Sequence, residues 1–230
     1  MIIKGLQKLT LLDFPGHVAC TIFTSGCNYR CPFCHNASLA LSRDEGADYS
    51  EEEILDFLKK RTGILDGVAI TGGEPLIWPD IIDLLRKIKE IGFMVKLDTN
   101  GTFPDRLKEI IDEGLVDYVA IDIKNSPEKY AQTVGKDDAL LDKLRESVNI
   151  LMNGGVDYEF RTTVVDELHT AEDIKKIGEF IKGAKRWFLQ NFVDSGDLIS
   201  SGMHAAPEEK MRKYLEISRV YVPTAELRGI

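Results

Sequence analysis

The chain has 230 residues, of which 43% are hydrophobic and 29% charged, as in an ordinary globular protein that builds one sizeable domain. Its formal net charge of −9, from 38 acidic and 29 basic residues, argues against a general binder of nucleic acid or anionic membranes. The first residues lack the features of a signal peptide, and no apolar run approaches the roughly 18 residues that span a bilayer. We therefore expect a cytoplasmic protein.

Short β-rich runs alternate with segments of helical period along most of the chain. The predicted strands cover residues 17–23, 67–71, 93–99, 116–123, 157–165 and 186–192. Such alternation predicts βαβ units and a parallel sheet covered by helices. Six units fall short of a complete eight-unit barrel, which typically needs about 250 residues. The predicted fold is therefore α/β, an incomplete, open (β/α)6 TIM-like barrel with outer helices, and a doubly wound sheet is the alternative.

Helix start and stop signals lie between these strands. Residues 50–53 form a capping box, and Gly92 ends an amphipathic run that opens at Trp78-Pro79. Pro104 and Pro127 stand where a helix favours proline, at its first position. The predicted helices cover residues 54–60, 80–92, 105–114, a segment that starts at 126–127, 138–155, 170–183 and 207–220.

The unusual polar and glycine-rich residues fall just after the predicted strands. In barrels and in doubly wound sheets, the working groups lie on loops past the C-terminal ends of the strands. The segments at these positions are residues 27–36, 71–75, 98–101, 122–125, 160–163 and 189–192. This coincidence predicts one site built from all six strand ends.

Three of the four cysteines, Cys27, Cys31 and Cys34, stand within eight residues and are followed at once by His35. In a cytoplasmic protein, clustered cysteines more often bind metal than form disulfides. Three chemistries fit the stretch: a c-type haem attachment site, a zinc site that includes His35, or three thiolates holding an iron–sulfur cluster with one iron left open. The expected compartment argues against haem. Zinc is disfavoured because two neighbouring residues rarely reach one metal, and Cys20 is expected to be a core residue.

The cysteine spacing Cx3Cx2C, with Phe33 before the last cysteine, is followed after the second strand by Gly-Gly-Glu-Pro at 72–75. Together these motifs resemble the radical S-adenosylmethionine (radical SAM) superfamily over essentially the whole chain. The resemblance implies a [4Fe–4S] cluster whose open iron is chelated by SAM, and reductive cleavage of SAM to a 5′-deoxyadenosyl radical. It places Phe33 at the cofactor, and the implied cluster ligands are Cys27, Cys31 and Cys34.

The same resemblance implies that Gly72, Gly73 and Glu74 bind the methionyl amino group of SAM. Glycines suit this role because a bare backbone comes close to a ligand. The alternative is that the segment is a plain turn between a strand and a helix.

A finer resemblance is to the activases of glycyl radical enzymes, and most closely to the activating proteins of anaerobic ribonucleoside-triphosphate reductase. It is carried by residues 9–16, 24–36, 97–101 and 120–124. The chain departs from the activase pattern in two places. The histidine expected after the last strand has no evident counterpart, so Gln190 or Asn191 would have to serve, and residues 13–18 read Asp-Phe-Pro-Gly-His-Val instead of the motif common in activases.

The activase resemblance implies further site residues. Asn100 and Lys124 line the SAM pocket together with Asp98, and Arg161 is the candidate for the SAM carboxylate. The resemblance also implies a monovalent cation, which is physically reasonable because two carboxylates that converge from adjacent strands need a counter-charge. Its implied ligands are Asp98, Thr99 and Asp122. The alternatives are that the aspartates cap helices and that Arg161 forms a surface ion pair.

We therefore expect a single radical SAM domain over residues 1–230, with an extension at 1–16, a barrel core at 17–192 and a partner-facing segment and helix at 193–230. Within the last part, residues 194–206 are expected to gate or bind the partner. The implied reaction is hydrogen abstraction from a glycine of a glycyl radical enzyme, with a flavodoxin- or ferredoxin-like electron donor. The alternatives are a radical SAM enzyme acting on a small molecule, as in 7-deazaguanine biosynthesis, and a non-enzymatic iron–sulfur or zinc protein.

Overall fold

A computed structural model describes residues 1–42, 46–137 and 140–229 of the chain. These residues contain one eight-stranded sheet with the strands in sequence order. The strands are β1 (Ile3–Thr10), β2 (Ala19–Thr24), β3 (Gly67–Gly72), β4 (Met94–Thr99), β5 (Tyr118–Asp122), β6 (Asp157–Val164), β7 (Trp187–Asn191) and β8 (Glu226–Arg228). β1 is antiparallel to β2, and each following pair of neighbours is parallel.

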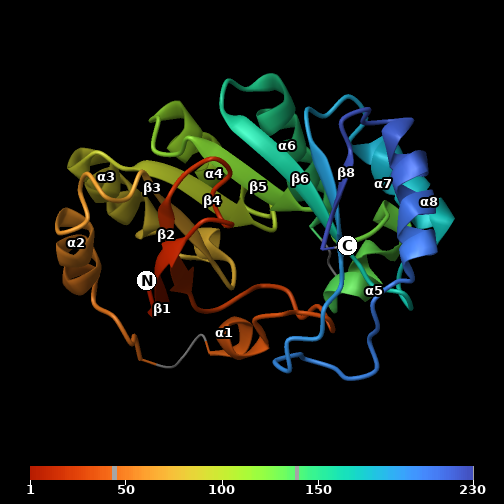
Figure 1. The fold of residues 1–230 in the computed structure, drawn as a ribbon, viewed down its shortest axis with the longest axis horizontal. Coiled ribbons are helices and arrows are strands. Elements are labelled where there is room, and N and C mark those ends of the chain that lie inside the picture. Colours follow the sequence, from red (N-terminus) through yellow and green to blue (C-terminus); the bar gives the residue numbers. More distant parts are fainter. Residues whose placement is uncertain (43–45, 138–139, 230) are drawn as a thin grey trace.

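The sheet curves into an open arch whose convex side carries most of the helices (Figure 1). These helices are α2 (Glu51–Lys59), α3 (Ile81–Ile91), α4 (Pro104–Asp112), α6 (Leu141–Asn153), α7 (Ala171–Phe180) and α8 (Glu208–Arg219). Two short helices, α1 (Ala37–Leu41) and α5 (Tyr130–Val134), follow β2 and β5. The predicted fold class, an incomplete (β/α)6 barrel with a parallel sheet and outer helices, is confirmed. No helix in the described ranges is both long and apolar enough to cross a membrane.

Local signals in the sequence account for the helix boundaries. The capping box of α2 forms as predicted, since Glu53 N–H donates to the Ser50 hydroxyl and Ser50 N–H donates to the Glu53 carboxylate. Gly92 ends α3 with a φ of 105°, a left-handed conformation that favours glycine. The helix predicted to start at 126–127 is a 3₁₀ turn (Pro127–Lys129) followed by α5. Residues 138–139, the predicted start of α6, lie outside the described residues.

The two faces of the central strands differ in chemistry, because successive side chains point to opposite sides. On β4, Val95 and Leu97 are fully buried in the hydrophobic cluster beneath the helices. The residues between and after them, Lys96 and Asp98, lie on the opposite face, where their side chains form an ion pair. A parallel sheet covered by helices usually has apolar strands. The concave face of this arch is therefore unusual in carrying charged side chains.

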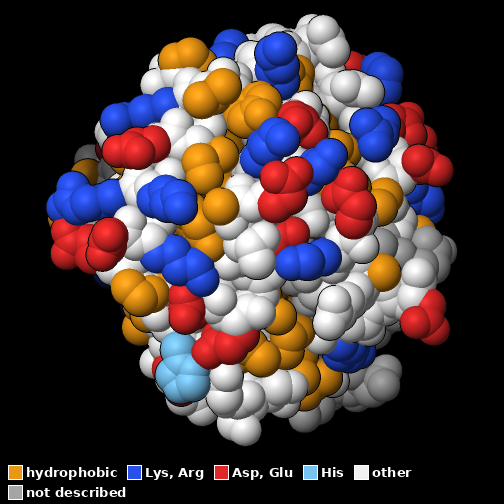
Figure 2. Space-filling model, turned by 90° about the vertical axis from the view of Figure 1, so that its right-hand side faces the viewer, with side chains coloured by type: hydrophobic (Ala, Val, Ile, Leu, Met, Phe, Trp, Pro, Cys, Tyr) orange, Lys and Arg blue, Asp and Glu red, His pale blue; other side chains and the backbone are white. Residues whose placement is uncertain are grey.

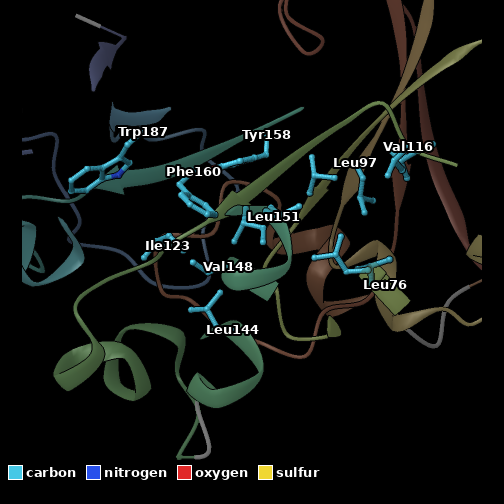
Figure 3. Packing of buried hydrophobic residues seen from close by; sticks show 14 of the residues in the cluster. Leu76, Leu97, Val116, Ile123, Leu144, Val148, Leu151, Tyr158, Phe160 and Trp187 are labelled. Carbon is cyan, nitrogen blue, oxygen red and sulfur yellow. The ribbon is translucent and has the colours of Figure 1, made fainter. Parts of the chain in front are cut away.

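The hydrophobic core lies between the sheet and its outer helices (Figure 3). Helix α6 contributes Leu144, Val148 and Leu151, whose spacing of four and three residues places them on one face. They meet residues such as Phe160 of β6, and each buried side chain of this size contributes about 1.5–3 kcal/mol to stability.

Strand β8 was not predicted from the sequence, because it has only three residues and is held in the sheet by contacts with side chains far away in the sequence. Arg228 donates two hydrogen bonds to the buried carboxylate of Glu159, at 2.8 and 2.9 Å. Its guanidinium also stacks on the ring of Phe188, 3.4 Å from the centroid. The Tyr118 hydroxyl donates to the same carboxylate at 2.8 Å. These contacts hold β8 against the sheet, at the ends of the strands opposite the cysteine loop.

Candidate active site

A cavity of about 250 Å³ lies at the C-terminal ends of the parallel strands. Of the residues that the sequence assigned to the site, Glu74 alone does not line it. Those that do are Cys27, Cys31, Phe33, Cys34, Gly72, Gly73, Asp98, Thr99, Asn100, Asp122, Lys124 and Arg161. The structure thus brings residues from five strand ends together. The sixth strand predicted from the sequence, which is β7 in the structure, contributes Gln190.

The three clustered cysteines are free thiols that surround this cavity. Burial raises the pKa of Cys27 to about 11 and that of Cys31 to about 12. Such thiols stay protonated near neutral pH unless a metal displaces the proton, and a coordinating thiol is deprotonated outright. Three cysteine sulfurs around one cavity therefore fit an iron–sulfur cluster as the resident group. Cys20 is fully buried in β2 and does not line the cavity.

Two N–H donors point at the sulfur of Cys27. The backbone N–H of Tyr29 lies 3.4 Å from this sulfur, and the side-chain amide of Asn100 lies 3.9 Å from it. Hydrogen bonds to cluster sulfurs tune reduction potential, so Asn100 and the backbone of the cysteine loop can adjust the electronics of a bound cluster.

His35 also lines the cavity. Its Nε2 atom has no evident structural role. Its ring stacks on Phe192, with 5.3 Å between centroids. Its Nε2 is buried and has no hydrogen-bond partner among the described residues. Burial lowers the pKa of His35, and the charge of Lys124 lowers it further. The ring is thus neutral near pH 7.

The two glycines of the Gly-Gly-Glu-Pro segment allow β3 to lie against the start of the cysteine loop. Gly73 N–H donates to Thr24 C=O and Glu74 N–H donates to Gly26 C=O, both at 2.8 Å. A Cβ atom at Gly73 would lie 2.0 Å from the Gly26 oxygen, and one at Gly72 would lie 2.3 Å from the Thr24 oxygen. Glycine is required at both positions because backbone occupies the space of a side chain.

Glu74 links the end of β3 to the end of β4. Its carboxylate is fully buried and accepts hydrogen bonds from Leu76 N–H at 3.0 Å, the Thr99 hydroxyl at 2.7 Å and Asn100 N–H at 2.6 Å. Burial raises the pKa of Glu74 to about 7, against the effect of these three donors. The carboxylate therefore positions Asn100, and the groups of this segment that face the cavity belong to Gly72 and Gly73.

Replacement Glu74→Gln should lower the free energy of unfolding by about 1–3 kcal/mol at pH 8, because the amide NH₂ must face a buried N–H donor. The pKa of Glu74 is about 7 in the folded protein and 4.5 in its ordinary state, so the folded state binds more protons between these values. Stability of the wild type should then fall as pH rises through this window. Urea unfolding at several pH values measures both effects. If stability of Glu74→Gln depended on pH in the same way as stability of the wild type, the raised pKa of Glu74 would not be the cause of that dependence. The control is Glu216→Gln, at an exposed position.

Charged side chains of three strands meet at the cavity wall. Arg161 donates through Nε to Asp122 Oδ1 at 2.8 Å and through Nη1 to Asp98 Oδ2 at 3.1 Å. Lys124 donates to Asp122 Oδ2 at 2.9 Å, and Lys96 donates to Asp98 Oδ1. Asp98 and Asp122, at the ends of neighbouring strands, thus share Arg161 as a partner.

The residues predicted to bind a monovalent cation already have other partners in the structure. All four oxygens of Asp98 and Asp122 already accept hydrogen bonds from cationic side chains. The Thr99 hydroxyl, the third predicted ligand, donates to Glu74 instead.

Lys96, which is only 2% exposed, was not predicted from the sequence as a residue of the site. Its signal was a lysine between apolar residues of a predicted strand, two positions before Asp98.

The segment 192–200 crosses the open side of the arch beside α1 (Figure 1). The carboxylate of Asp197 accepts hydrogen bonds from Ser38 N–H and, at 2.7 Å, from the Ser38 hydroxyl. Ser200 N–H donates to Pro32 C=O at 3.0 Å. This crossing segment therefore holds the cysteine loop in place.

On the face of the molecule that carries α8, Lys and Arg side chains are interspersed with Asp and Glu (Figure 2).

Replacement Asp197→Ala should free the start of α1, because Ser38 loses its acceptor, at a cost of about 1 kcal/mol in the free energy of unfolding. We expect faster amide hydrogen exchange at Ser38 and in the cysteine loop. Asp194→Ala is the control, since the Asp194 carboxylate accepts from Gly196 N–H within its own loop. Unchanged exchange at Ser38 in Asp197→Ala would show that the crossing segment does not restrain the cysteine loop.

Comparisons with known proteins agree with this site. The model of the Radical SAM superfamily matches residues 21–181. A Methanocaldococcus jannaschii protein, provisionally named a glycyl-radical enzyme activating enzyme, is 33% identical over 238 residues, covering 100% of this chain and 96% of its own. The pyruvate formate-lyase-activating enzyme of Clostridium pasteurianum is 30% identical over 190 residues, covering 80% of this chain and 77% of its own.

Solved structures agree on the fold. Streptococcus suis SuiB bound to its precursor peptide SuiA superposes with a TM-score of 0.70 at 17% identity, over 90% of this chain and 47% of SuiB. The family model spans most of the barrel, including the three cysteines and the Gly-Gly-Glu-Pro segment. Membership in a family of enzymes removes the alternative of a non-enzymatic iron–sulfur or zinc protein. The chain belongs to the radical SAM superfamily and is an enzyme whose cofactors are a [4Fe–4S] cluster and S-adenosylmethionine.

Proposed function

We propose that the chain is an activating enzyme that abstracts a hydrogen atom from a glycine of a glycyl radical enzyme. The observation that carries the proposal is the joint lining of one cavity by three thiols of one loop, the Gly72–Gly73 strand end and the Arg161 charge cluster. The two relatives with activase names support the same class, and one of them matches along the whole chain. We further propose an anaerobic ribonucleoside-triphosphate reductase as the partner and a flavodoxin- or ferredoxin-like protein as the electron donor.

The residues of the cavity divide the work of binding. Cys27, Cys31 and Cys34 would hold the cluster, which would supply the electron for cleavage of the sulfonium bond of SAM. Backbone carbonyls at Gly72 and Gly73 are acceptors for an ammonium group. Arg161 offers N–H donors to a carboxylate.

Lys124 balances the negative charge of the thiolates. Its side chain lines the cavity and donates to Asp122 at 2.9 Å. Burial lowers the pKa of Lys124, but Asp122 and the nearby Cys31 outweigh burial and raise it above its ordinary value. The lysine therefore stays charged beside the cysteines, where a fixed positive charge favours deprotonated sulfur.

The test is anaerobic incubation of the reconstituted enzyme with SAM, a reductant and an anaerobic ribonucleoside-triphosphate reductase. We expect 5′-deoxyadenosine together with the doublet of a glycyl radical in the EPR spectrum of the partner. Formation of 5′-deoxyadenosine without that doublet would contradict this partner. If other glycyl radical enzymes also gave no doublet, the outcome would favour an enzyme that acts on a small molecule, as in 7-deazaguanine biosynthesis.

A further inference from the structure

Arg161 is fixed between two carboxylates at the wall of the cavity. Its guanidinium reaches Asp122 through Nε at 2.8 Å and Asp98 through Nη1 at 3.1 Å, and its side chain is 17% exposed. The two aspartates stand on neighbouring strands, β4 and β5, and Arg161 on β6 pairs in register with Asp122. The planar, permanently charged fork is therefore held in one orientation by two ion pairs.

Counted without the nearby cysteines, the charges of this cluster leave an excess of one positive charge. Two carboxylates, Asp98 and Asp122, face three cations, Lys96, Lys124 and Arg161. Each carboxylate oxygen has its own cationic donor. An ion that bound these oxygens would lie beside Arg161 and a lysine, whose positive charges would repel it.

Arg161 keeps donors for a ligand. A guanidinium has five N–H groups, and the two aspartates take one at Nε and one at Nη1. Arg161 lines the cavity, so donors not used by the aspartates are available to an anionic group inside it. The amino acid part of SAM carries such a group in its carboxylate, which guanidinium binds through paired hydrogen bonds.

We propose that Arg161 takes the place of a monovalent cation in this enzyme. It neutralises Asp98 and Asp122 and binds the carboxylate of SAM with its remaining donors, so that binding of the cofactor requires no alkali metal ion. The inference rests on the SAM chemistry of the proposed function and is independent of which glycyl radical enzyme is the partner.

The first test needs no variant. The dissociation constant of SAM is measured by anaerobic calorimetry on the cluster-loaded enzyme in potassium, sodium and choline chloride at equal ionic strength. We expect values that agree within about twofold in all three salts. A loss of affinity of about tenfold or more in choline would overturn the inference and leave the proposed function intact. Absence of SAM binding in every salt would instead contradict the proposed function.

The second test removes the guanidinium. In Arg161→Met, we expect SAM affinity to fall by about tenfold or more in choline and to recover in part with potassium, because the aspartates are left open to an ion. Unchanged affinity in choline, or a loss that potassium does not relieve, would contradict the replacement. Arg228→Met is the matched control: it also strips a buried carboxylate, Glu159, of its arginine, but at a place outside the cavity. Its SAM affinity should not depend on the salt.

Discussion

Replacement Cys31→Ser should abolish cleavage of SAM, with a loss of more than about 100-fold in the rate of 5′-deoxyadenosine formation. Substitutions that only touch the surroundings of a metal ligand cost 10–100-fold, and removal of a ligand costs more. Cys31 is one of three thiols around the cavity, and the fourth cysteine, Cys20, is buried in β2 outside it. The measurement is product formation by the anaerobically reconstituted variant, together with its iron content.

The matched control is Cys20→Ala. Cys20 is fully buried in β2 and lies outside the cavity, so its loss should cost some stability but leave the cluster and SAM cleavage in place. If Cys20→Ala lost its iron while Cys31→Ser kept it, the assignment of the cluster to the loop would be wrong.

Replacement Gly73→Ala should have the second largest effect, because it disturbs the backbone that supports the cysteine loop. The new Cβ would lie 2.0 Å from the carbonyl oxygen and 2.7 Å from the carbonyl carbon of Gly26, the residue just before Cys27. Neither backbone segment can yield without breaking the hydrogen bonds at Thr24 and Gly26. We expect the free energy of unfolding to fall by at least about 2 kcal/mol, and the reconstituted protein to bind less iron.

Gly155→Ala is the control for Gly73→Ala. A Cβ at Gly155 would meet nothing within 4 Å, and the residue lies on the surface before β6. This variant should keep the stability and the iron content of the wild type. Denaturant unfolding and iron analysis of the two variants decide the matter, and a Gly73→Ala protein that matches Gly155→Ala in both would show that the close approach of β3 to the loop is not needed.

The barrel strands could be predicted because they are short apolar runs bounded by turn residues. The edge strands were missed for physical reasons. β1 is mostly exposed or half-buried and lacks an apolar run, and β8 depends on the pairing of Arg228 with Glu159, 69 residues away. A contact over that distance leaves no local pattern in the sequence.

The candidate site, like the fold, could be predicted only in part from the sequence. The spacing of the cysteines and the Gly-Gly-Glu-Pro segment carry the resemblance, and they point to residues that the structure gathers around one cavity. The sequence does not show that the carboxylate of Glu74 turns toward β4, nor that Asp197 reaches Ser38, 159 residues away. Such details depend on packing between distant segments. The roles of individual residues in binding the cofactor stay predictions.

In the proposed site, three thiolates hold a cluster with one iron open to SAM. The most direct measurement is the EPR spectrum of the reduced, reconstituted enzyme before and after addition of SAM. An open iron that SAM chelates changes its coordination, so we expect a clear change of the spectrum with SAM. A cluster whose spectrum ignores SAM, or a reconstituted protein that holds zinc in place of iron, would contradict it.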